Sequence, residues 1–305
     1  MKKHWGAHIT LLITSLLFGA NYWIAKGLMP DYFQPLQVIF MRVLGAMLLF
    51  WLLQLFTPKE KVAKKDLWLI GLSASLGVAV NQIMFFEGLS LTTPVDTSII
   101  HSSSPLLVLM FAAFLAHERI TLMKIVGIVM GMTGTLILVL YGNEVSFDSS
   151  SFRGDLFILI NISAYSMYLV LIKPVMARYR PVTVMKWVFF FGFIFVLPVS
   201  VWRIPDINWH QVDGFALFSL LYVIIGTTFL AYLLTIYALR YVNASVAGFY
   251  IYLQPVFAAL IGILLFDEVL TTHKIIAAIL IFAGIFVVNR RHPEKTVNSG
   301  KKKDV

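Results

Sequence analysis

The sequence contains no cysteine, and this absence excludes disulfide bonds, thiolate metal sites and a cysteine nucleophile. Charged residues are also scarce: they make up 13% of the 305 residues, about half of the roughly 25% that is usual in globular proteins. Hydrophobic residues reach 59%. A soluble chain of this composition could not cover its surface with polar groups, whereas lipid solvates an apolar surface. The composition therefore predicts an integral membrane protein.

Two familiar motifs are missing as well. No Walker A sequence occurs, so direct use of ATP is not expected. His117 and Glu118 begin a zinc-protease motif, but residue 121 is threonine, so the second histidine ligand is absent. We therefore expect no metal site.

Long apolar runs account for most of the chain. Roughly 20 helical residues cross about 30 Å of hydrocarbon, and these runs are continuous rather than alternating, which disfavours a β-barrel. The predicted fold is an all-α membrane protein with ten transmembrane helices, near residues 7–28, 35–56, 67–88, 96–116, 122–141, 154–173, 182–202, 213–239, 244–266 and 273–289.

The basic residues predict how the chain is oriented. With the N-terminus in the cytoplasm, 19 of the 24 lysines and arginines fall on the inner side. Only four fall outside, and Arg42 lies within a span. This is the positive-inside pattern of a protein in the cytoplasmic membrane with both termini in the cytoplasm. The net charge of +9 thus reflects topology, and no nucleic-acid partner is expected. A cleaved signal peptide after Met1-Lys2-Lys3 is a less favoured alternative.

The two halves of the chain resemble each other. Residues 18–26 (FGANYWIAK) align with 165–173 (YSMYLVLIK) at an offset of 147. The offset then becomes 150 and pairs Pro105, Leu115, Glu118, Thr121, Lys124, Ile125 and Gly134 with Pro255, Leu265, Glu268, Thr271, Lys274, Ile275 and Gly284. Each half holds five predicted spans, an odd number, so the halves must be inverted in the membrane. We expect five-helix repeats at 1–146 and 147–291, followed by a disordered, basic cytoplasmic tail at 292–305.

This plan resembles the EamA-type carriers of the drug/metabolite transporter superfamily. The resemblance is carried by FGAN at 18–21, Arg42 after Pro35, and the P…E-x-x-T…K…G blocks at 105–134 and 255–284. Phe18 and Tyr165 depart from it, because the family often has tryptophan there. The resemblance implies export of amino acids, related metabolites or drugs, without a cofactor.

Polar residues within the spans are the candidate binding residues, because each costs free energy in hydrocarbon. Arg42 lies about 10 Å below the outer boundary at helical rise. Four further residues share this depth: Asn21, Asn81, Gln82 and His101. One hypothesis is a wet cavity in which Arg42 holds a carboxylate and the amides bind neutral polar atoms. The alternative is a structural network in which Glu87 or Asp96 neutralises Arg42.

Two prolines predict a second feature of the site. Pro105 and Pro255 lie near the middle of the fourth and ninth spans, where each should kink its helix. Paired interruptions in two halves point to a binding site. Tyr250 and Gln254 lie beside the second proline, and Tyr168 on the sixth span could join them.

The two E-x-x-T motifs favour a structural role. We expect Glu118 and Glu268 to hold the short loops in which they lie. Thr121 and Thr271 should cap the helices that follow them.

These observations favour a secondary transporter that moves a small-molecule substrate across the lipid bilayer, outward, by alternating access. A coupling proton is a candidate partner, and the sequence specifies no oligomeric state. An enzyme acting on a lipid-linked substrate is the main alternative, but it would need a pair of catalytic groups that the spans do not supply. A sensor or scaffold is a weaker one.

Overall fold

The computed structural model describes residues 2–26, 28, 32–91, 100–101, 103–140, 152–265 and 271–289. Asp96, Glu268 and the tail at 292–305 lie outside these residues. Within these ranges the chain is helical and contains no β-strand. The helices are α1 Lys2–Lys26, α2 Pro35–Leu55, α3 Lys64–Ala74, η1 Ser75–Val80, α4 Asn81–Leu91, α6 Ser104–Ala116, α7 Leu122–Leu140, α8 Phe152–Met176, α9 Pro181–Ser200, η3 Val201–Asp206, η4 Trp209–Gln211, α10 Gly214–Leu221, η5 Tyr222–Leu230, α11 Ala231–Leu239, α12 Ala244–Phe249, η6 Tyr250–Tyr252, α13 Leu253–Leu265 and α14 Thr272–Asn289.

Several of these helices are suited to crossing a bilayer. Among the described residues, six continuous helical stretches are long and apolar enough to do so, and three apolar helices are shorter. A helix overlaps each segment that the sequence predicts as a span. Large apolar side chains point outward: Phe114 on α6 is 80% exposed and Leu264 on α13 is 76% exposed. Lipid can solvate such side chains, so the chain is a multi-pass membrane protein.

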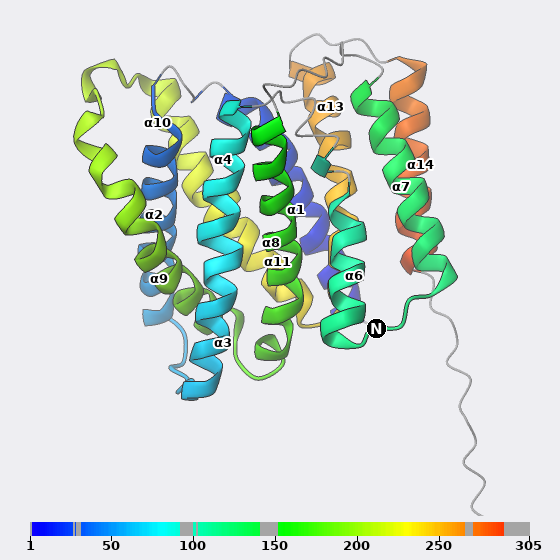
Figure 1. Ribbon diagram of the computed structural model, residues 1–305, viewed down its shortest axis with the longest axis horizontal. Helices are drawn as coiled ribbons and strands as arrows, with labels where there is room; N and C mark the ends of the chain where they lie inside the picture. Colours follow the sequence, from blue (N-terminus) through cyan, green and yellow to red (C-terminus); the bar gives the residue numbers. More distant parts are fainter. Residues whose placement is uncertain are drawn as a thin grey trace, which may run out of the picture.

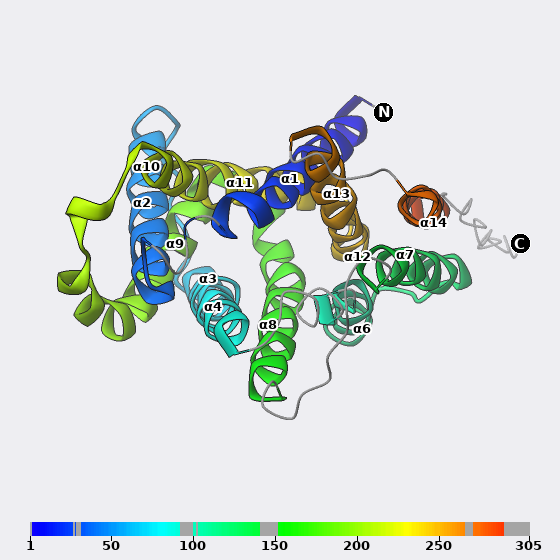
Figure 2. The same ribbon diagram turned by 90° about the horizontal axis from the view of Figure 1, so that it is seen from above.

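The bundle has two groups of helices with a pair between them. In the view from above, α2, α3, α4, α9, α10 and α11 lie on one side, and α6, α7, α12, α13 and α14 on the other (Figure 2). Helix α1 packs against α11 and α13, whereas α8 packs against α4 and α6. These two helices therefore bridge the groups.

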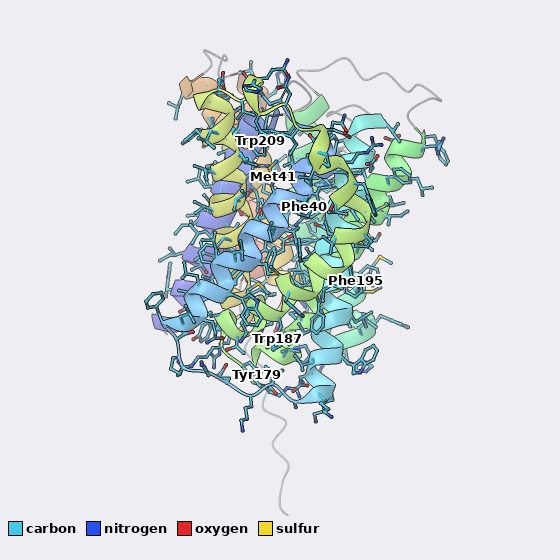
Figure 3. The ribbon with its side chains drawn as sticks, turned by 90° about the vertical axis from the view of Figure 1, so that its left-hand side faces the viewer. Phe40, Met41, Tyr179, Trp187, Phe195 and Trp209 are labelled. Carbon is cyan, nitrogen blue, oxygen red and sulfur yellow. The ribbon has the colours of Figure 1, made fainter. Side chains whose placement is uncertain are left out.

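The N-terminus defines one end of the bundle, which we call the N-terminal face; α3 begins at the same end (Figure 1). Tyr179 and Trp187 lie toward this face, and Trp209 lies near the opposite one (Figure 3). Aromatic side chains near both ends of the helices match the two interfaces of a bilayer.

The helical geometry changes shortly before each of the two prolines. Pro105 is the second residue of α6, directly after a turn at Ser103. Pro255 is the third residue of α13, and α13 begins directly after the 3₁₀ turn η6. Pro255 lies within the continuous helical stretch Ala244–Leu264, which contains this 3₁₀ turn, and the kink at each proline stays a prediction. Proline has no N–H to donate, so the first helical turn accommodates it, and the preceding chain leaves the α conformation.

Helices α7 and α14 are in close contact along glycines. A Cβ atom added to Gly284 would lie 2.8 Å from the carbonyl oxygen of Gly127 and 3.1 Å from the amide nitrogen of Gly131. Neither backbone atom can move without separating the helices, so these glycines set the spacing between α7 and α14.

Gly284→Ala should therefore destabilise the protein by about 1–3 kcal/mol, because overpacking outweighs the better helix propensity of alanine. Gly214→Ala is the matched control, since a Cβ atom there meets nothing within 4 Å. Thermal unfolding in detergent should show a lower Tm for Gly284→Ala and an unchanged or higher Tm for Gly214→Ala. Equal Tm values would contradict the close contact.

Candidate functional site

Arg42 on α2 is the centre of the candidate site. Its side chain is buried, with the residue 7% exposed, and its Nε donates a hydrogen bond to Thr228 Oγ1 at 2.9 Å. The guanidinium carbon lies 5.6 Å from the centre of the Phe86 ring on α4. Thr228 itself donates to the carbonyl of Val223 at 2.6 Å, which leaves its oxygen free to accept from Arg42. That bond spans five residues, as the wider turn of the π-helix η5 allows.

The rest of the guanidinium group is unpaired. Throughout the described ranges, neither terminal nitrogen of Arg42 has a hydrogen-bond partner, and no carboxylate lies within 4 Å. Glu87, one of the two acids that the structural alternative names, is thus not its ion-pair partner. A buried guanidinium without a counter-ion costs free energy unless water or an anionic ligand reaches it.

Gln82 lies one helical turn before Phe86 on α4. The residue is 2% exposed, and neither its Nε2 nor its Oε1 has a hydrogen-bond partner in the described structure. The Tyr232 hydroxyl donates to the carbonyl of Gly77 at 3.1 Å, and its oxygen, which can still accept, is near enough to interact with this amide. Each unmet polar group costs about 1–3 kcal/mol, so Gln82 marks a place where a polar ligand would stabilise the protein.

Tyrosines from the second half of the chain complete this region. Tyr232 on α11 also lies within electrostatic range of Arg42. Tyr168 on α8 is 1% exposed, and its hydroxyl has no partner among the described residues. Its ring centre lies 6.4 Å from that of Tyr232. A Cβ atom on Gly77 would come within 2.3 Å of the Tyr168 ring, so only glycine lets this tyrosine approach η1.

Asn21 joins the candidate site indirectly. Its Oδ1 accepts a hydrogen bond from Thr227 Oγ1 at 3.5 Å, and the next residue, Thr228, holds Arg42. The Thr227–Thr228 pair on η5 therefore links α1 with α2. Sequence reasoning missed it, although two adjacent hydroxyls within an apolar run were a usable signal.

Asn81 and His101 gather around a different residue. Asn161 on α8 donates from Nδ2 to the Asn81 carbonyl at 2.6 Å, and its Oδ1 lies 3.1 Å from Nε2 of His101. The ring of His101 lies 5.6 Å from that of Phe85. These residues form a polar contact between α4 and α8 rather than a group around Arg42. The sequence reasoning overlooked Asn161.

Tyr250 and Gln254 have contacts with α1. The Tyr250 hydroxyl lies 2.7 Å from Nδ1 of His8, and its carbonyl accepts from Ser15 at 2.8 Å. The Gln254 carbonyl would be 2.8 Å from a Cβ atom on Gly19. The eight residues that the sequence selects thus fall into three local groups, and Arg42, Gln82 and Tyr168 lie in the most enclosed one.

Glu118 holds the loop at the N-terminal face, as predicted. It accepts a hydrogen bond from Ser245 at 2.7 Å and forms ion pairs with Lys124 at 3.3 Å and Lys173 at 3.4 Å. Burial pushes the pKa of Glu118 up, but the Ser245 hydroxyl and the two ammonium groups outweigh it and lower the pKa. The cap is confirmed too, since Thr121 Oγ1 accepts from the Lys124 amide at 3.3 Å.

Comparison with known proteins agrees with this architecture. The EamA-like transporter family matches residues 5–140 and 152–290, one block in each half. The uncharacterized transporter YetK of Bacillus subtilis is 23% identical over 96% of this chain and 90% of its own. An uncharacterized transporter of Archaeoglobus fulgidus is 26% identical over 95% of this chain and 100% of its own.

A WAT1-related protein of Arabidopsis thaliana is 24% identical over 75% of this chain and 70% of its own. A protein of known crystal structure shares the fold with a TM-score of 0.76, at 18% identity over 93% of this chain and 96% of the other. Matched in both halves of a multi-pass helical bundle, this chain belongs to the EamA-like transporter family.

Proposed function

We propose that the protein is a secondary transporter that moves a small metabolite outward across the cytoplasmic membrane by alternating access. One observation carries this proposal: Arg42 is buried between the two halves with both terminal nitrogens unpaired among the described residues. A guanidinium group presents a planar fork that binds a carboxylate through two hydrogen bonds. The substrate is an amino acid, a related compound or a drug-like solute with such a group.

The proposal includes two inverted five-helix halves, and the contacts between glycines support it. Gly127 packs against Gly284, and Gly134 packs against Ala277. Gly127 and Ala277 are 150 residues apart, as are Gly134 and Gly284. An exchange of partners of this kind is what a two-fold axis produces.

Irregular turns recur at the same offset. The π-helical segments Ser75–Val80 and Tyr222–Leu230 overlap when the first is shifted by 150 residues. Gln82 and Tyr232, which are also 150 residues apart, are neighbours beside Arg42. The candidate site therefore lies close to the proposed axis, where inverted-repeat transporters bind their substrates.

A tyrosine–aspartate hydrogen bond occurs once at each face. Tyr179 donates to Asp66 at 2.8 Å at the N-terminal face (Figure 3), and Tyr32 donates to Asp213 at 2.9 Å. Tyr32 precedes Phe33, whose ring lies 6.2 Å from that of Trp209, near the opposite face. Both the tyrosines and the aspartates are 147 residues apart. Two inverted repeats would place equivalent bonds at opposite membrane surfaces, and the positions of these two bonds support that arrangement.

Metabolite profiling tests the function directly. The medium of an overproducing strain should gain a carboxylate compound that a deletion strain retains inside its cells. The compound should leave the cell chemically unchanged. An unchanged medium together with an altered lipid pool would favour the enzyme acting on a lipid-linked substrate.

Both termini should face the cytoplasm. Because the chain has no cysteine, single-cysteine variants can be labelled without background. In intact cells, a membrane-impermeant maleimide should label Trp209→Cys but not Lys61→Cys, both of which replace exposed residues. After the cells are lysed, the maleimide should label Lys61→Cys as well. Labelling of Lys61→Cys in intact cells would contradict the proposed orientation.

A further inference from the structure

We propose that this site selects a carboxylate that carries a neutral amide, as in an N-acylated amino acid, over the corresponding free amino acid. The inference rests on the proposed function, because it assumes that Arg42 binds the carboxylate of the solute. It concerns the second group of that solute. Gln82 is the residue that would recognise it.

Gln82 can recognise a second polar group of the solute through its side-chain amide. A side-chain amide both donates and accepts hydrogen bonds, and here both its nitrogen and its oxygen are buried and unpaired in the described structure. A secondary amide offers the complementary pair, one N–H donor and one carbonyl acceptor. A ligand halide or ether oxygen can only accept, so it would leave Oε1 of Gln82 unmet. The N–H of such an amide can donate to Oε1 of Gln82, or its carbonyl can accept from Nε2.

Gln82 lies in the same region of the bundle as Arg42. Phe86, which stacks under the guanidinium of Arg42, is one helical turn from Gln82 on the same face of α4. Tyr232 interacts with both Arg42 and Gln82. The Arg42 guanidinium, which would bind the carboxylate, and the Gln82 amide are thus neighbours. The carboxylate and the amide of an N-acylated amino acid are neighbours in the same way.

Charge also favours the acylated compound. A free amino acid would bring an ammonium group next to the Arg42 guanidinium, where a carboxylate is needed to balance it. Among the described acidic residues, Glu60, Asp66, Glu118 and Asp206 pair with basic residues near helix ends, and Asp213 accepts from Tyr32. Glu87 and Asp155 have interactions of their own. Acylation removes the ammonium charge and supplies the amide.

The test compares three probes on the purified full-length protein in detergent: N-acetyl-L-leucine, L-leucine and L-leucinamide. Ligand-induced thermal stabilisation should give a Kd for N-acetyl-L-leucine about tenfold or more below that for L-leucine, because an unpaired buried amide rejects a ligand that cannot meet it. L-Leucinamide, which has no carboxylate, should not bind. Arg42→Gln should abolish binding of all probes.

Variants of Gln82 separate this inference from the proposed function. Gln82→Met keeps the volume of the side chain and should weaken the binding of N-acetyl-L-leucine about tenfold. It should also raise the Tm of the ligand-free protein, since two unmet polar atoms disappear. Gln82→Glu should shift the preference toward L-leucine. Ser163→Ala, on the half-exposed part of α8, is the matched control and should leave both Kd values unchanged.

Each outcome has a definite meaning. Equal Kd values for N-acetyl-L-leucine and L-leucine, both lost in Arg42→Gln, would overturn the amide inference and leave the carboxylate site intact. Binding that survives in Arg42→Gln would overturn the proposed site itself. An unchanged preference in a well-folded Gln82→Met protein would remove Gln82 from recognition.

Discussion

Replacing Arg42 by glutamine should abolish transport while the protein remains folded and inserted. The guanidinium group contributes two free terminal nitrogens that a glutamine amide cannot reproduce, and losing one partner of a buried charge pair typically costs about 2–5 kcal/mol of binding free energy. We expect initial rates in proteoliposomes to fall about a hundredfold or more. Arg42→Lys should recover little, because a point charge lacks the planar fork.

Stability measurements distinguish this role from a structural one. In the described part of the chain Arg42 has no acidic partner, so the Tm of Arg42→Gln should be unchanged or higher than that of the wild type. A lower Tm, restored when an acidic residue is also neutralised, would instead identify a structural ion pair. Normal transport by a well-expressed Arg42→Gln protein would exclude Arg42 from the site.

Asp66→Asn should cost much more stability than Asp213→Asn, although the two aspartates occupy equivalent positions in the halves. Asp66 has a side chain only 4% exposed, and it binds both Tyr179 and the Arg178 guanidinium, at 2.8 Å each. Its loss leaves Arg178 without a counter-ion. Because Arg178 is partly exposed, we expect a cost of about 2 kcal/mol, less than that of a fully buried pair.

The second aspartate supplies the control. Asp213 is exposed and caps α10 by accepting from the Ala216 amide at 2.7 Å, a role that asparagine fills nearly as well. Thermal unfolding in detergent should therefore show a Tm several degrees lower for Asp66→Asn and little change for Asp213→Asn. Equal losses of Tm would indicate that the greater burial of Asp66 does not make its contacts more stabilising than those of Asp213.

The sequence was sufficient to predict the features that depend on the length of a segment and on the chemistry of adjacent residues. A run of about 20 apolar residues predicts a helix long enough for a bilayer. A threonine directly before such a run predicts the cap at Thr121, and hydrogen bonding confirms it. The depth of Arg42 could likewise be counted along its helix.

The partners of Arg42 could not be predicted, because residue spacing gives depth along a helix but not which neighbour it faces. Asn81 and His101 share that depth with Arg42, yet both turn toward Asn161. The π-helical segments change the direction in which the following side chains point around the helix axis. No sequence pattern predicted these π turns. Thr228 could only be recognised once η5 was in place beside α2.

Accessibility of a single cysteine at position 165 tests the central claim most directly. Tyr165 on α8 is half-buried next to Tyr168 in the candidate site. In a transport-competent Tyr165→Cys protein, alternating access predicts labelling by an impermeant thiol reagent from either side of the membrane. It also predicts that solute changes the two rates in opposite directions and that Arg42→Gln abolishes this response. Labelling from one side only, at a rate that solute does not change, would contradict a substrate site between two alternating halves.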